Sequence, residues 1–224
     1  MSALSTSISA HRSQPALHPH TPVTYRKQLR AAGGRRSHLA SFIRALIDNP
    51  RRTGAAFPSF PALARQMAQL VPQHPSGLIL ELGPGTGPVT RALLNRGLDH
   101  TKLILIERSK QMVQCLVEHF PSLQIIEGDA RYTSQLLRHK LGKDHLPVSV
   151  IVSSLPLKVL PSSTVQHIAD EAYRLLPHGG LVIQFTYDIR RKAKSVYEQC
   201  GFHKVGSRIV WANMPPARVD WYRK

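Results

Sequence analysis

A glycine-rich segment that follows an apolar stretch is the part of this sequence best suited to ligand chemistry. It reads Glu81-Leu82-Gly83-Pro84-Gly85-Thr86-Gly87 and begins within the predicted strand Leu78–Leu82. Glycines here let a nucleotide-like ligand approach the backbone at the carboxyl end of a first strand. A dinucleotide fingerprint starting at Gly83 needs glycine where the chain has Pro88, and a phosphate loop needs a Gly-Lys-Ser/Thr that is absent. The spacing therefore argues against dinucleotide and ATP binding.

Three further predicted strands end in polar or small residues. The strands are Leu103–Glu107, Gln124–Glu127 and Val148–Ser153, and helix-length segments separate them, as in a doubly wound parallel sheet. They lead into Glu107, into Glu127-Gly128-Asp129-Ala130 and into Ser153-Ser154-Leu155-Pro156-Leu157. Each residue also has a structural interpretation: Glu107 as a strand-end acid, Asp129 as a helix cap, Gly83 as a turn. Four such sites at four consecutive strand ends favour a common binding edge.

The rest of the chain supplies the elements that position these residues. A helix is predicted from Phe60 to Leu70, and a fifth strand, Leu181–Thr186, follows a Pro/Gly turn. Lys204–Ala212 and Arg218–Tyr222 are predicted to pair as an antiparallel hairpin at the sheet edge, connected by Asn213–Pro216. With 224 residues and no internal repeat, the chain is expected to hold one core.

The amino-terminal part has a different composition. Residues 1–36 contain no acid and are rich in Ser, His, Pro, Thr and Arg, so we expect a disordered basic tail, with an organellar transit peptide as the alternative. From His38 to Pro50, apolar residues recur at helical spacing. The stripe comprises Leu39, Phe42, Ile43, Leu46 and Ile47, and its flanking cations are Arg35, Arg36, Arg44, Arg51 and Arg52. Such a helix either packs on the core or lies in a lipid interface.

Composition limits the classes of partner and site. The 30 Lys and Arg residues against 13 acids give a net charge of +17, which favours phosphate-bearing partners such as nucleic acid or anionic lipid. No apolar run reaches the ~18–20 residues needed to cross a bilayer. Two cysteines, Cys115 and Cys200, lie far apart, and the 12 histidines are scattered. Neither a disulfide framework nor a metal site is expected.

The glycine segment resembles the E-x-G-x-G-x-G pattern of S-adenosylmethionine-dependent methyltransferases of the Rossmann-like class I. In that class a carboxylate after the second strand binds the ribose hydroxyls, and an acid after the third lies beside the adenine amine; Glu107 and Asp129 match these. The resemblance implies S-adenosylmethionine as cofactor and an α/β fold with a mainly parallel seven-stranded sheet and an antiparallel C-terminal edge. The implied cofactor residues are Glu81, Gly83, Pro84, Gly85, Thr86, Gly87, Glu107, Arg108, Gly128, Asp129, Ala130 and Ser153.

Within that class, residues 37–224 resemble the bacterial phospholipid N-methyltransferases, which convert phosphatidylethanolamine to its methylated forms and to phosphatidylcholine. The resemblance rests on Phe42–Gly54, Ala55–Ser59, Leu80–Gly87, Val152–Leu157, Gln184–Tyr187 and Asn213–Val219. The Ser-Leu-Pro-Leu and Gln-Phe-Thr-Tyr pieces discriminate better than the glycine loop, which the superfamily shares. Three parts are implied: the tail 1–36, membrane- or substrate-binding helices in 37–76, and a methyltransferase core in 77–224.

The same resemblance locates the acceptor amine near the end of the fourth strand. Ser154, Leu155 and Pro156 are expected to form one wall, with the Ser154 hydroxyl or the Leu155 carbonyl guiding the amine. Tyr187 is expected to contact the ethanolamine head group, with packing on the core as the alternative. Arg190 and Arg191 either hold the lipid phosphate or form a solvated charge pair.

Lipid recognition is expected to involve an anionic membrane surface. The residues assigned to it are Leu39, Phe42, Ile43, Arg44, Leu46, Ile47, Arg51, Arg52 and Arg190. Cations near an anionic surface and apolar anchors together give reversible binding. The expected protein is a cytoplasmic monomer that associates peripherally with the inner membrane.

Two other functions remain open. The rRNA adenine dimethyltransferases are similar to the lipid family, and an RNA partner would suit the net charge. They carry Asn-Leu-Pro-Tyr after the fourth strand, where Asn accepts from the exocyclic amine and Tyr stacks on a flipped base. Here Ser154 is shorter than Asn, Leu157 cannot stack, and no RNA-binding domain is predicted after the sheet, so lipid is favoured. The third alternative is a catalytically silent, cofactor-binding membrane protein.

Overall fold

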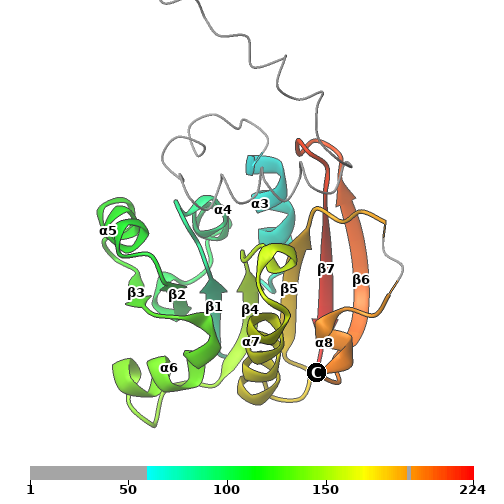
Figure 1. The fold of residues 1–224 in the computed structure, drawn as a ribbon. Helices are drawn as coiled ribbons and strands as arrows, with labels where there is room; N and C mark the ends of the chain where they lie inside the picture. Colours follow the sequence, from blue (N-terminus) through cyan, green and yellow to red (C-terminus); the bar gives the residue numbers. More distant parts are fainter. Residues whose placement is uncertain (1–59, 191–192) are drawn as a thin grey trace, which may run out of the picture. The chain divides into compact units, whose positions relative to one another are not determined.

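The computed structural model describes residues 60–190 and 193–224, and its central feature is a single sheet (Figure 1). Within these ranges seven strands follow the order β3-β2-β1-β4-β5-β7-β6. The strands β1 to β5 pair in parallel, and β7 runs antiparallel to both β5 and β6. The predicted α/β fold, mainly parallel with an antiparallel C-terminal edge, is confirmed.

Strands and helices alternate along most of the described chain. The strands are β1 (Leu78–Leu82), β2 (Leu103–Glu107), β3 (Gln124–Glu127), β4 (Val148–Ser153), β5 (Leu181–Thr186), β6 (His203–Val210) and β7 (Ala217–Arg223). The helices are α3 (Phe60–Gln69), α4 (Pro88–Asn95), α5 (Lys110–His119), α6 (Thr133–Leu141), α7 (Ser162–Leu175) and α8 (Val196–Gln199). Short 3₁₀ helices are η2 (His100–Lys102), η3 (Ala130–Tyr132) and η4 (Leu157–Val159).

The predicted strand limits agree closely with the structure for the parallel strands and less well for the hairpin. β6 ends at Val210, two residues before the predicted limit at Ala212. The chain turns there because the Asn213 amide donates a hydrogen bond to the Val210 carbonyl at 3.2 Å. The hairpin pairing itself is confirmed.

Apolar residues alternate along the central strands and supply a core on each face of the sheet. Ile79 and Val152 pack in one cluster with α3, α4 and α5, whereas Leu80 and Ile151 pack in the other with α6, α7 and α8. Figure 1 shows these helices on the two sides of the sheet. Because helices cover both faces, the carboxyl edge of the strands is the place where loops meet a ligand.

Helix α3 packs on this core. Leu63 and Met67 are fully buried among sheet residues. Arg96, just after α4, donates hydrogen bonds to the carbonyls of Ala68 and Val71, which satisfies groups that the end of a helix leaves unpaired. The predicted N-terminal part, residues 37–76, includes α3, and this helix packs on the sheet.

Some sequence predictions concern residues outside the described ranges. These are the tail 1–36, the helix with the stripe Leu39–Ile47 and its arginines, and Arg191. They stay predictions. None of the helices in the described ranges is long and apolar enough to span a membrane.

Candidate active site

Two glycines of the loop between β1 and α4 differ in the space that surrounds them. Gly83 and Gly85 have φ values of 67° and 59°, in the left-handed region that favours glycine. A Cβ added at Gly83 would lie 2.4 Å from a methyl carbon of Leu155, whereas one added at Gly85 would meet nothing within 4 Å. Gly83 is therefore packed against the segment after β4, and Gly85 faces open space.

That space is part of a cavity of about 350 Å³ at the carboxyl edge of the strands. Residues from the four predicted sites at the ends of β1, β2, β3 and β4 line it, and Tyr187 after β5 lines it as well. Every cofactor residue predicted from the sequence lines it except Glu81, Gly87 and Ser153. Ser154, Leu155, Pro156 and Tyr187 also line it, whereas Arg190 does not.

Glu107 presents a fixed carboxylate to the cavity. One of its oxygens accepts a hydrogen bond from the Gly85 amide at 3.1 Å, and the other accepts from the Ser109 amide at 2.8 Å. A carboxylate has about four acceptor sites, so each oxygen keeps one for a ligand. Both amides orient the group without consuming its capacity to bind two neighbouring hydroxyls.

Asp129 lines the cavity but is also held by a neighbour. Its oxygens accept hydrogen bonds from the backbone and the guanidinium of Arg131 at 2.9–3.1 Å. Partial burial disfavours the charged form, but these bonds and the Arg131 charge outweigh it and lower the pKa of Asp129. The carboxylate caps η3, so the helix-cap interpretation is confirmed, and its place in the cavity wall remains compatible with a ligand contact.

Glu81 lies beneath the glycine loop and does not line the cavity. It is fully buried, and its two oxygens accept hydrogen bonds from the hydroxyls of Thr90 at 2.7 Å and Ser154 at 3.0 Å. Burial raises the pKa of Glu81 to about 7, although both hydrogen bonds oppose the shift. Glu81 connects the start of α4 to the acceptor side of the cavity, and its assignment to cofactor binding stays a prediction.

Gly87 and Ser153 also shape the cavity from behind. A Cβ at Gly87 would lie 2.4 Å from the ring of Phe120, so this glycine permits close packing of α4 and α5. Ser153 is buried in β4, where it is in register with Leu82 and Gln184. Both residues support the cavity wall, and their assignment to cofactor binding stays a prediction.

The carbonyl of Leu155 is already engaged within the protein. It accepts hydrogen bonds from the side-chain amide of Gln184 at 2.9 Å and from the backbone amide of Leu157 at 3.0 Å. A carbonyl has two lone pairs, and both are used. This corrects the expectation that the Leu155 carbonyl guides an amine: it fixes the loop instead, and the Leu155 side chain contributes to the wall.

Ser154 and Tyr187 remain as polar groups of the acceptor side. Ser154 donates its hydrogen to Glu81, so its oxygen faces the cavity as an acceptor. Tyr187 packs edge to face on Phe185, with ring centroids 5.5 Å apart. Burial raises the pKa of Tyr187 above its usual value, although a hydrogen bond with the Asn213 side chain opposes the shift. The hydroxyl is thus protonated at neutral pH.

A methyltransferase family model matches the chain. It is described as a methyltransferase domain and covers residues 79–180, from β1 to the turn before β5. The matched range contains the glycine loop, Glu107, Asp129 and Ser154, which are the groups gathered at the cavity. The chain is an S-adenosylmethionine-dependent methyltransferase, and its fold is Rossmann-like.

Curated relatives of this methyltransferase include lipid and RNA enzymes. The ornithine lipid N-methyltransferase of Singulisphaera acidiphila is 28% identical over 132 residues, which are 58% of this chain and 67% of the relative. The ribosomal RNA small subunit methyltransferase A of Allorhizobium ampelinum is 34% identical over 91 residues, but the match spans only 32% of that protein and 39% of this one.

The fold also matches solved structures of methyltransferases. Fibrillarin from Aeropyrum pernix, solved with natively bound S-adenosylmethionine, superposes with a TM-score of 0.55 at 15% identity. The match covers 73% of this chain and 76% of fibrillarin. At this identity the likeness concerns the fold.

The cavity of the methyltransferase fits S-adenosylmethionine in its chemistry. Glu107 offers a carboxylate for paired hydroxyls, Gly85 leaves room for close approach, and Met112 and Ala130 add apolar wall. No group of three His, Cys, Asp or Glu residues that could hold a metal ion lies in residues 60–190 or 193–224.

Several residues of the methyltransferase site were not predicted from the sequence. Phe60, the first residue of α3, lines the cavity together with Met112, Thr164 and Ile168. Ser109 stands two residues after Glu107 and could have been found as a local hydrogen-bond donor. The others contribute ordinary apolar or hydroxyl groups from helices, and their types carry no signal for a site.

Proposed function

We propose that this methyltransferase transfers methyl groups to the amine of a membrane lipid, with phosphatidylethanolamine and its methylated forms as substrates. The observation that carries the proposal is the acceptor side of the cavity. One oriented hydroxyl, on Ser154, lies among apolar groups of Leu155, Pro156, Leu160 and Phe185. This combination suits a small amine attached to an apolar molecule.

The hydrogen bond from Ser154 to Glu81 decides the polarity of the wall. Because the Ser154 hydrogen points to the carboxylate, the oxygen is left to accept an N–H from the substrate. An amine held in this way keeps its lone pair free for the methyl group. The Tyr187 hydroxyl retains its proton at neutral pH and can donate to an oxygen of the head group.

The chemistry demands little further apparatus. S-adenosylmethionine, when bound, supplies a methyl group that a sulfonium sulfur already activates. The residues of the chain then have to orient the amine and exclude water. A primary alkylammonium titrates near ~10 by analogy with lysine, so it must lose a proton before it can react. The apolar wall supports that loss because desolvation favours the neutral amine.

A comparison of relatives supports lipid over RNA. The ornithine lipid enzyme matches over two thirds of its length, whereas the matched part of the ribosomal RNA enzyme is a third of its length. Leu157, at the position where the RNA enzymes carry a stacking tyrosine, packs against the core cluster of α6, α7 and α8. An adenine ring would find no aromatic surface from this residue.

RNA methylation is the second candidate because of the net charge of +17 and the ribosomal RNA relatives. Phosphate backbones attract such a charge without regard to sequence. The charge alone supports an anionic bilayer equally well. We further propose that the enzyme works at the cytoplasmic face of the inner membrane, bound peripherally through residues 37–59 and the charge of the chain.

Label transfer tests the proposal. The purified full chain is incubated with methyl-labelled S-adenosylmethionine and one of three acceptors: phosphatidylethanolamine vesicles, ornithine lipid vesicles, or protein-free small-subunit ribosomal RNA. We expect label in phosphatidylethanolamine, and chromatography then counts the methyl groups added. Label confined to ornithine lipid would change the substrate, and label confined to RNA would overturn the proposal. Glu107→Ala is the cofactor-deficient control.

A further inference from the structure

The connection between β6 and β7 exposes two large apolar side chains. Trp211 is 69% exposed and Met214 is 73% exposed, the highest values among large hydrophobic residues in the described part of the chain. Between them Asn213 is buried, and its side-chain amide donates to the Pro215 carbonyl at 2.7 Å. The connection, residues 211–216, is thus anchored from within while Trp211 and Met214 face outward. We call these two side chains the hairpin tip.

The hairpin tip lies beside the cavity. β7 begins where β5 ends, since Arg218 is in register with Thr186 and Val219 with Phe185. Tyr187, which lines the cavity, packs against a core cluster that includes Val210 and Ala217, the last residue of β6 and the first of β7. Figure 1 shows the hairpin extending to the carboxyl edge of the parallel strands. The exposed apolar groups therefore stand at the same edge of the sheet as the cavity and Ser154.

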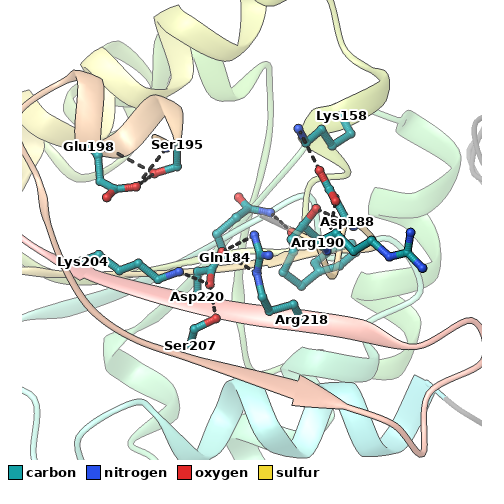
Figure 2. Close-up of polar contacts among 12 residues, drawn as sticks. Lys158, Gln184, Asp188, Arg190, Ser195, Glu198, Lys204, Ser207, Arg218 and Asp220 are labelled. Carbon is teal, nitrogen blue, oxygen red and sulfur yellow. Dashed lines mark hydrogen bonds and ion pairs between the residues drawn. The ribbon is translucent and has the colours of Figure 1, made fainter. Parts of the chain in front are cut away.

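The base of the hairpin is held by a buried charge cluster (Figure 2). Asp220 on β7 accepts hydrogen bonds from Lys204 at 2.7 Å and Ser207 at 2.6 Å on β6, and it pairs with Arg218 at 3.0 Å. Asp220 and Arg218 are almost fully buried, so the pairing is shielded from solvent. A hairpin fixed in this way presents its tip at a defined position relative to Tyr187.

The charges near the tip suit an anionic surface. Residues 205–219 contain no acid, and they include Arg208, which is exposed. Arg190, in the loop after β5, is exposed as well, and Figure 2 shows its guanidinium extending away from Asp188. Tryptophan prefers the head-group level of a bilayer, and cations beside it add attraction to anionic lipid.

We propose that the hairpin tip inserts into the head-group region of an anionic bilayer and holds the cavity against the membrane. The inference rests on the proposed lipid substrate and adds to it a second membrane contact, located in the methyltransferase core. Insertion of Trp211 and Met214 removes their apolar surface from water. It also brings Tyr187 and Ser154 close to the level of the lipid amines.

Tryptophan fluorescence tests the inference directly. The chain has two tryptophans, so Trp221→Phe leaves Trp211 as the only reporter. With phosphatidylglycerol and phosphatidylcholine vesicles, we expect Trp211 emission to shift to shorter wavelength and to be quenched by brominated lipid. Unchanged emission under conditions where the protein sediments with vesicles would overturn the inference, and so would absence of sedimentation. A shift that needs no vesicles and grows with protein concentration would also overturn it, since it would indicate self-association.

Binding measurements supply the energetic test. Trp211→Ser and Met214→Ser should each weaken vesicle binding by about 10-fold, because each removes one apolar anchor. Matched controls are Val205→Ser and Leu146→Ser, since both side chains are 52% exposed. Val205 lies on the same hairpin but far from its tip, and Leu146 lies just before β4, at the amino-terminal end of the parallel strands. Equal effects of all four substitutions would contradict a specific tip.

Activity on detergent-dispersed phosphatidylethanolamine separates this inference from the proposed function. If lipid is the substrate but the hairpin tip does not insert into the bilayer, the wild type methylates lipid in micelles and in vesicles. Trp211→Ser then does the same. If the lipid substrate is wrong, the wild type methylates neither preparation. The expected result is that Trp211→Ser keeps its rate in micelles and loses about 10-fold of its apparent affinity for vesicles.

Discussion

At the cofactor end of the cavity, the wall consists mainly of loop backbone and of carboxylates that nearby amides hold in place. At the acceptor end, it consists mainly of apolar side chains from elements far apart in the sequence. Glu107 is held by Gly85 and Ser109, both close to the same edge. The Leu155 side chain packs against the core cluster that includes residues of α6, α7 and α8, and its carbonyl accepts a hydrogen bond from Gln184, 29 residues away. One end therefore depends on a few polar groups, and the other depends on packing.

The largest effect is expected from Glu107. Replacing it with alanine removes two charge-assisted bonds to ligand hydroxyls, so Glu107→Ala should weaken S-adenosylmethionine binding by ~2–4 kcal/mol. Calorimetry on the folded variant measures this loss. Glu127→Ala is the matched control, because Glu127 ends the neighbouring strand in register with Glu107 but is exposed and does not line the cavity. Similar losses for both variants would mean that Glu107 acts only as a strand-end acid.

The next effect concerns Glu81, which joins the two ends. Its pKa is about 7 in the folded chain against 4.5 when unperturbed, so the folded state holds a proton that the unfolded state releases as pH rises. The contribution of this bound proton to the free energy of unfolding is fully present below pH 4.5 and is lost as pH rises through 7. The pKa difference corresponds to about 3 kcal/mol as an order of magnitude.

Glu81→Gln should remove that pH dependence. Denaturant unfolding at about pH 5 and about pH 8 should show a smaller loss of stability in the variant than in the wild type. Glu127→Gln controls for a change of charge at an exposed acid. If the wild type and Glu81→Gln lost stability equally between the two pH values, the carboxylate would be ionised throughout.

A smaller effect is expected at the acceptor end from Tyr187. Tyr187→Phe keeps the ring packed on Phe185 and removes one hydroxyl. Loss of one positioning hydrogen bond costs ~0.5–3 kcal/mol, so the methylation rate should fall by roughly 3- to 150-fold while cofactor affinity is unchanged. Ser154→Ala probes the other polar group of the same wall. A wild-type rate in Tyr187→Phe would leave Ser154 as the remaining side chain that guides the amine.

The smallest effect sharpens the boundary between the two ends. Gly83→Ala and Gly85→Ala each place a side chain at positive φ, at a cost of about 1 kcal/mol. Only the added methyl at Gly83 meets Leu155, so Gly83→Ala should lose more stability and also slow methyl transfer. Gly85→Ala should mainly weaken cofactor binding, because its methyl group would occupy part of the cavity in which the cofactor is expected to bind. Thermal unfolding and calorimetry on both variants make the comparison, and equal profiles would contradict it.

The cofactor end could be predicted from the sequence because its signals are local. The apolar runs by themselves predict the parallel strands. The glycines and the acids at the ends of β2 and β3 stand at or directly after these runs, so their place in the fold follows from the sequence. The acceptor end could be predicted only in part, because the Leu155 loop is fixed by a tertiary hydrogen bond from Gln184. Phe60 likewise reaches the cavity wall from a helix whose sequence carries no site signal. Even near the cofactor end, the burial of Glu81 could not be inferred from the sequence. The orientation of its carboxylate depends on hydrogen bonds from Thr90 and Ser154.

Phe60 has a further consequence for how substrate arrives. It is the first residue of α3 and part of the cavity wall, so the preceding 59 residues are joined covalently to the chain at the active site itself. Any molecule bound by the segment just before it is presented to the cavity as an intramolecular reactant. Short tethers of this kind give local concentrations of about millimolar. Under the proposed lipid substrate, a weak lipid contact just before Phe60 would raise the local lipid concentration at the cavity.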